Sequence, residues 1–142
     1  TNNAAWQRVA DAHTLHSLLC AGFDYEGHGQ SDGDFKSADD LELLVDDALQ
    51  FIEEMKTSHS GLKIFVRAQS MGGLVALATA LRRPQLFAGL TLGAPALELP
   101  WIVGKFAPQT ILKGGPCVMD LISSLSLPVA VFQGVEDTTV NP

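Results

Sequence analysis

The clearest structural signal in this chain of 142 residues lies in Leu62-Lys63-Ile64-Phe65-Val66-Arg67-Ala68-Gln69-Ser70-Met71-Gly72-Gly73-Leu74. An apolar strand pattern runs into Ser70, and a helical pattern begins directly after it. A serine at the apex of a sharp strand-to-helix turn exposes its hydroxyl, and the N-terminus of the helix can stabilise a developing oxyanion. We therefore predict a nucleophile elbow with Ser70 at its apex.

The residues around Ser70 suit such a turn. Strand and helix backbones cross closely there, which favours small residues two positions before and two positions after the serine. Ala68 and Gly72 are small, although Ala68 stands where glycine is more usual. Gln69 and Met71 complete the elbow. The alternative interpretation of Ser70 is an ordinary serine at a helix N-cap.

A literal G-x-S-x-G pattern occurs at another serine, in Gly29-Gln30-Ser31-Asp32-Gly33. A motif is confirmed by its structural context, and here the context is absent. The residues after Ser31 are polar and contain no apolar helix, so they indicate a turn. The imperfect pattern at Ser70 is therefore the better candidate for a nucleophile.

Composition limits the class of protein. With 46% hydrophobic residues the chain is long enough for one globular domain with a substantial core. The net charge of −7 argues against a nucleic-acid partner, because phosphate binding needs a basic surface.

Cys20 and Cys117 lie in apolar settings and are predicted to be buried free thiols of a reducing compartment, without metal-ligand spacing. No signal peptide or membrane-spanning run is evident, which favours a cytoplasmic location. The start at Thr1 suggests a processed product or a fragment.

Apolar runs alternate with helical patterns along the chain. Strands are expected at 18–24, 62–69, 87–93 and 128–133, and helices at 4–17, from Ser37 to about 57, and at 72–83. Ser37 is the predicted N-cap of the second helix, with Asp39 and Asp40 in its first turn. This alternation predicts an α/β domain with a parallel sheet and flanking helices, spanning 1–142 as a single domain. The stretch 96–126 interrupts it and is expected to be a short cap insertion above the carboxyl ends of the strands.

Four segments together resemble one family. They are Asp24-Tyr25-Glu26-Gly27-His28-Gly29-Gln30-Ser31-Asp32-Gly33, Gln69-Ser70-Met71-Gly72-Gly73, Gly93-Ala94-Pro95, and Gln133-Gly134-Val135-Glu136-Asp137. In this order they are similar to the α/β-hydrolase family of monoacylglycerol lipases and lysophospholipases, most of all to its plant-type members. The resemblance covers nearly the whole chain and implies a partial α/β-hydrolase fold.

The resemblance also implies a function. It implies a serine ester hydrolase that cleaves a monoacylated lipid through an acyl-enzyme, without metal or cofactor. Ser70 falls on the nucleophile, the backbone N–H of Met71 on an oxyanion donor, and Asp137 on the acid of the triad. Glu136 is the alternative acid. The implied partner is a small lipid ester, with peripheral membrane contact possible and the oligomeric state open.

The catalytic histidine of the family has no counterpart in this sequence. All four histidines, His13, His16, His28 and His59, precede Ser70, whereas the family places this residue after the acid. The His-Gly motif that supplies a second oxyanion donor is also absent. Losing the histidine of such a triad typically removes about a million-fold in turnover. One lost oxyanion donor removes roughly a hundred- to a thousand-fold. The chain is therefore expected to be nearly inert towards esters.

Two other outcomes stay open. The chain could be a catalytically dead relative that acts as a binding or interaction protein, or a defective product without a stable fold. Arg67, Ala68 and the short cap favour the former. A charge such as that of Arg67 is costly in a central strand covered on both faces.

Several other features have competing interpretations. An apolar cluster either lines an acyl pocket, contacts a membrane or packs within the cap, and its members are Trp101, Ile102, Val103 and Phe106. An acidic group is read as a solvated helix face and not a metal site, and its members are Asp39, Asp40, Asp46 and Asp47.

Overall fold

A computed structural model describes residues 4–33, 40–97 and 122–134 of the chain. The elements are α1 (Ala4–Thr14), α2 (Leu41–Ser58), β1 (Phe65–Gln69), α3 (Met71–Arg82), the 3₁₀ turn η2 (Pro84–Leu86), β2 (Gly89–Gly93), the 3₁₀ turn η4 (Ile122–Ser124) and β3 (Val129–Phe132). The three strands form one parallel sheet in the order β1-β2-β3. The predicted α/β architecture with a parallel sheet and flanking helices is confirmed.

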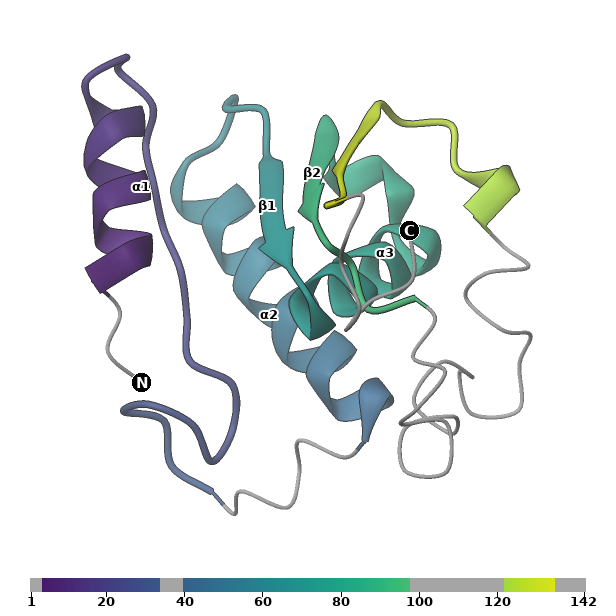
Figure 1. Ribbon diagram of the computed structural model, residues 1–142. Helices are drawn as coiled ribbons and strands as arrows, with labels where there is room; N and C mark the ends of the chain where they lie inside the picture. Colours follow the sequence, from purple (N-terminus) through teal and green to yellow (C-terminus); the bar gives the residue numbers. More distant parts are fainter. Residues whose placement is uncertain (1–3, 34–39, 98–121, 135–142) are drawn as a thin grey trace.

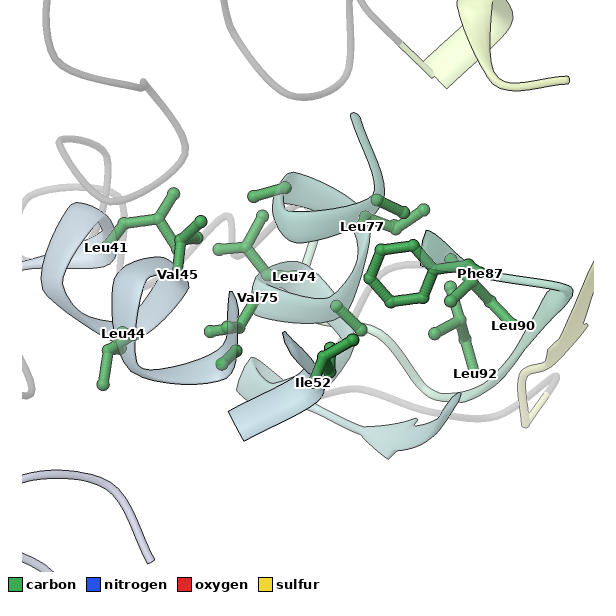
Figure 2. Packing of buried hydrophobic residues seen from close by; sticks show 14 of the residues in the cluster. Leu41, Leu44, Val45, Ile52, Leu74, Val75, Leu77, Phe87, Leu90 and Leu92 are labelled. Carbon is green, nitrogen blue, oxygen red and sulfur yellow. The ribbon is translucent and has the colours of Figure 1, made fainter. Parts of the chain in front are cut away.

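Helices α2 and α3 pack against each other and cover one face of the sheet (Figure 1). The side chains that fill this layer form one buried cluster, and ten of them are labelled in Figure 2: Leu41, Leu44, Val45, Ile52, Leu74, Val75, Leu77, Phe87, Leu90 and Leu92. Helix α3 is buried from Gly73 to Ala80 without interruption, so it forms the centre of the packed layer.

Helix α2 begins later than the sequence predicted. Its N-cap is Asp40, whose Oδ1 accepts a hydrogen bond from the N–H of Glu42 at 3.0 Å. The expected cap, Ser37, lies outside the described residues. An aspartate immediately before the first apolar residue satisfies a free N–H of the first turn, which explains why the helix begins at Leu41.

The predicted strand at 18–24 is not formed. This segment has no strand conformation and no partner in the described sheet, and Leu18 and Leu19 are 52% and 59% exposed. Cys20, predicted to be buried, is exposed for the same reason. A strand needs a hydrogen-bonding neighbour, and an apolar run alone does not provide one. Figure 1 shows the segment running between α1 and β1 without joining the sheet.

Arg67 does not lie in a strand covered on both faces. Along β1, the side chains of Phe65, Arg67 and Gln69 are exposed, while Val66 and Ala68 pack against the core. Within the described residues, β1 is an edge strand, paired with β2 alone. Arg67 therefore points to the uncovered face, and its charge stays solvated.

Candidate active site

Ser70 joins the last residue of β1 to the first residue of α3. Its backbone has φ 53° and ψ −125°, a conformation that L-residues rarely adopt. Such a conformation costs about 1–3 kcal/mol and persists only where the surroundings impose it. The strand, sharp turn and helix predicted around Ser70 are therefore all present.

The carboxyl end of β2 and the residues after it hold the backbone of Ser70 in place. The Ser70 N–H donates to the carbonyl oxygen of Gly93 at 3.0 Å. The Ser70 carbonyl oxygen in turn accepts the N–H of Ala96 at 3.0 Å and that of Gly73 at 2.9 Å. Both polar backbone groups are thus satisfied by neighbouring elements, which supports the strained turn.

The Ser70 hydroxyl is not used to build the helix. A serine at an ordinary N-cap accepts a hydrogen bond from a backbone N–H of the first turn. Ser70 makes no such bond, and the residue is exposed. Ser70 therefore occupies the N-cap position of α3, but its side chain does not act as the cap. Within the described part of the chain no group competes for the hydroxyl, so it is available to a bound molecule.

The tightest packing at the elbow lies at Gly73, a position that sequence reasoning missed. A Cβ on Gly73 would lie 2.8 Å from the Cβ of Pro95, whereas one on Gly72 would lie 4.0 Å from the Cβ of Ala68. The crossing at Ala68 and Gly72 thus has room for a methyl group. The pair Gly72-Gly73 in the sequence indicated a close approach here. The sequence did not indicate that Pro95 is the residue that approaches Gly73.

The other elbow residues flank the serine. Met71 is the first residue of α3, so its N–H has no acceptor within the helix. Gln69 ends β1 opposite Gly93, and its Cγ lies near the backbone of that glycine. Ala94, just beyond Gly93, also has a positive φ of 41°. Two non-glycine residues with positive φ, Ser70 and Ala94, therefore directly follow the paired strands β1 and β2.

The second candidate, Ser31, has a structural role. Its Oγ donates to the carbonyl oxygen of Asp24 at 2.6 Å, while Asp24 Oδ2 accepts the N–H of Gln30 at 3.0 Å. Gly29 has φ 55° and lies against the Asp24 side chain. This turn is closed by its own polar side chains, in agreement with the predicted turn.

The turn is anchored on α2 by an aromatic contact and a hydrogen bond. The ring of Phe23 lies 4.7 Å from that of Tyr25 and 4.8 Å from that of Phe51. The N–H of Glu26 donates to Asp47 Oδ2 at 3.1 Å. Burial, with a smaller contribution from the charge of Asp47, raises the pKa of Tyr25 to about 12.

The four histidines lie in α1, the segment after it, the Ser31 turn and the end of α2. The Nδ1 atoms of His13 and His28 lie 2.7 and 2.9 Å from the carbonyl oxygens of Val9 and Glu26. His59 is the C-cap of α2, and its N–H donates to the Met55 carbonyl. Asp137, Glu136 and the apolar cluster Trp101–Phe106 lie outside the described residues.

The acidic residues of α2 make protein contacts. Asp40 caps the helix, Asp46 Oδ1 pairs with Arg82 at 2.6 Å, and Asp47 binds the Glu26 N–H. Asp39 lies outside the described residues. In the described ranges, His, Cys, Asp and Glu side chains form no group of three or more that could hold a metal ion.

Comparison with known proteins identifies the family. The serine aminopeptidase S33 family of hydrolases (Hydrolase_4) matches residues 3–114, so the chain belongs to this family. Among curated relatives, human monoglyceride lipase is 41% identical over 78 residues, which are 55% of this chain and 26% of that protein. Mouse monoglyceride lipase is 35% identical over 86 residues, covering 59% and 28%. The match thus spans about a quarter of the length of these relatives.

Solved structures agree on the fold. A monoacylglycerol lipase of Paleococcus ferrophilus superposes with a TM-score of 0.70 at 20% identity, covering 98% of this chain and 71% of that one. Est1E of Butyrivibrio proteoclasticus, solved with bound ferulic acid, superposes with a TM-score of 0.66 at 24% identity, covering 82% of this chain and 57% of that one. The chain therefore has a partial α/β-hydrolase fold.

Among the described residues, no helix combines the length and the apolar character needed to cross a bilayer.

Proposed function

We propose that Ser70 is the nucleophile of a serine hydrolase that cleaves monoacylglycerol or lysophospholipid-like esters. The conformation of Ser70 is the observation that carries the proposal: its φ is 53°, its backbone is held on both sides, and its hydroxyl is not used as a cap. The likeness to monoglyceride lipases supports the substrate class.

The proposed reaction has two steps. The Ser70 Oγ attacks the ester carbonyl while a histidine takes its proton, and the N–H of Met71 donates to the oxyanion. Collapse of the intermediate breaks the acyl C–O bond, the histidine gives its proton to the departing alcohol, and the acyl group stays on Ser70. Water then attacks this acyl-enzyme and releases the fatty acid. Asp137 is the proposed acid that holds the histidine tautomer.

The 142-residue chain on its own is proposed to be nearly inactive. The rings of His13 and His28 are next to carbonyl oxygens of their own segments, and His59 belongs to the C-terminal end of α2. We propose that none of them takes the place of the family's catalytic histidine, because all of them precede Ser70 in the chain. Without that base, about a million-fold in turnover is lost.

Hydrolysis of a monoacylglycerol by the purified chain tests this proposal. Circular dichroism must first show that the chain and its Ser70→Ala variant are folded. We expect turnover of both proteins to be indistinguishable from that of buffer. Turnover that the chain shows and Ser70→Ala lacks would support Ser70 as nucleophile, but it would refute the proposed inactivity.

The alternative proposal is a catalytically silent relative that binds lipid esters without cleaving them. The histidine positions favour it, whereas Arg67 no longer does, because its side chain is exposed. Saturable binding of a non-hydrolysable monoacylglycerol ether, unaffected by Ser70→Ala, would support this alternative. We further propose a cytoplasmic protein with peripheral membrane contact, which would bring it to the lipid esters proposed as its substrates.

A further inference from the structure

A hollow of about 400 Å³ lies at the amino end of β1, where the turn after α2 meets η2 and the start of β2. Lys56 and Lys63 line it together with the apolar side chains of Leu62, Phe65, Leu86 and Phe87. The strand from Phe65 to Ser70 spans roughly 16 Å at the usual rise of a β-strand. The hollow is therefore at the opposite end of the sheet from the candidate nucleophile.

The charge of this hollow contrasts with that of the chain. The chain carries a net charge of −7, yet no carboxylate lines the hollow among the described residues. Neither Lys56 nor Lys63 forms an ion pair within the described ranges, whereas Arg82 and Arg83 are paired with acids of α2. A neighbouring hollow along α2 is instead lined by three acidic side chains, those of Asp46, Glu53 and Glu54. The hollow at the amino end of β1 is thus lined by cations without carboxylates, unlike the hollow along α2.

The apolar residues that line the hollow differ in exposure. Leu86 and Phe87 line the hollow with only 8% and 9% exposure and belong to the buried cluster, where Figure 2 shows Phe87 near Leu90. Leu62 and Phe65 are 56% and 69% exposed. Covering such side chains gains about 25 cal/mol per Å² of apolar surface. A ligand with an apolar chain would therefore be favoured here.

We propose that this hollow binds the carboxylate of a fatty acid, with its head group at Lys56 and Lys63 and its chain over Leu86 and Phe87. The volume falls within the usual range of small-molecule sites, and two ammonium groups that form no ion pair with the described residues complement one anionic head. A fatty acid is also the product of the reaction proposed above. The site itself does not depend on catalysis by Ser70.

Calorimetric titration with monomeric decanoate tests the proposal. We expect saturable binding that weakens at least about tenfold in Lys56→Gln/Lys63→Gln, because a charge-assisted contact contributes about 1.5–3 kcal/mol. Arg8→Gln is the matched control, since it removes an exposed cation of α1 and should leave binding unchanged. Decanol, which has the chain without the charge, should bind at least about tenfold more weakly than decanoate.

A second variant tests the exposed part of the lining. Leu62→Glu places a carboxylate beside the hollow at an exposed position, so it should weaken decanoate binding without loss of thermal stability. Ser70→Ala should bind decanoate like the original chain, which separates this site from the catalytic proposal. Absence of saturable binding, equal affinity in the double lysine variant, or binding to anionic phosphatidylglycerol vesicles but not to monomeric decanoate would each overturn the inference.

Discussion

Two turns of this protein place a serine between small residues, Gly29 and Gly33 around Ser31 and Ala68 and Gly72 around Ser70, and they use it in opposite ways. At Ser31, the hydroxyl closes the turn by donating to the Asp24 carbonyl at 2.6 Å. At Ser70, backbone groups of Gly93 and Ala96 hold the turn, and the hydroxyl takes no part. A structural serine thus contributes its side chain to stability, whereas the candidate nucleophile sits in a strained turn that its neighbours maintain. The difference can be measured by mutation.

The largest expected effect concerns the close approach beside Ser70. Gly73→Ala would place a Cβ 2.8 Å from Pro95 Cβ and 3.0 Å from its Cα, so we expect a loss of about 1–3 kcal/mol in the free energy of unfolding. Gly72→Ala is the matched control, because its Cβ would meet Ala68 at an ordinary 4.0 Å. It should be neutral or stabilising by up to about 1 kcal/mol. Urea unfolding of both variants measures the difference, and equal destabilisation would contradict this packing.

A smaller effect is expected from releasing the strain at Ser70. Glycine adopts positive φ without steric cost, so Ser70→Gly should raise the free energy of unfolding by about 1 kcal/mol. Ser70→Ala keeps the Cβ and should change stability by less than about 0.5 kcal/mol. Urea unfolding again provides the measurement. A destabilised glycine variant would show that the Ser70 side chain supports the fold.

Ser31→Ala should destabilise the protein, in contrast to Ser70→Ala. Removing its hydroxyl breaks the hydrogen bond to Asp24, and an exposed bond of this kind contributes about 0.5–1 kcal/mol. We expect the free energy of unfolding, measured with urea, to fall by that amount. The reactivity of Ser70 towards an electrophile should not change. A neutral Ser31→Ala would remove the contrast between the two turns.

The anchor of the Ser31 turn gives the smallest effect, which appears only at high pH. Tyr25 is the single tyrosine, and its pKa is raised from 10.0 to about 12. The folded state favours the neutral phenol, so this contribution to stability is complete below pH 10 and is lost as pH rises towards 12. Absorbance at the tyrosinate band should follow this raised pKa in the folded chain. If Tyr25 instead titrates near its ordinary pKa of 10.0, its phenol is open to water in the folded chain.

The sequence was informative where local pattern decides structure. The apolar run before Ser70 and the helix after it predicted β1, the turn and α3, and the polar residues after Ser31 predicted a turn there. The prediction of a strand at 18–24 was wrong because an apolar run shows only that its residues favour burial. It does not show that a neighbouring strand is present to pair with them. Exposure of Cys20 follows from the same missing contact.

Other features depend on residues far apart in the chain. The contact of Gly73 with Pro95 arises from the way α3 crosses the turn after β2, which no local pattern encodes. The exposure of Arg67 depends on which strands pair with β1. The catalytic roles of Ser70, Met71 and Asp137 stay predictions.

The most direct test of the account is to map where an electrophile modifies the folded chain. A fluorophosphonate is applied with imidazole in solution as the base, and peptide mass spectrometry locates the adduct. We predict that Ser70 reacts at least about tenfold faster than Ser31 or any other serine, because the N–H of Met71 stabilises the charge that develops. Ser31→Ala should leave this reaction unchanged. Adducts spread evenly over exposed serines, or concentrated at Ser31, would contradict the assignment of Ser70 as the nucleophile.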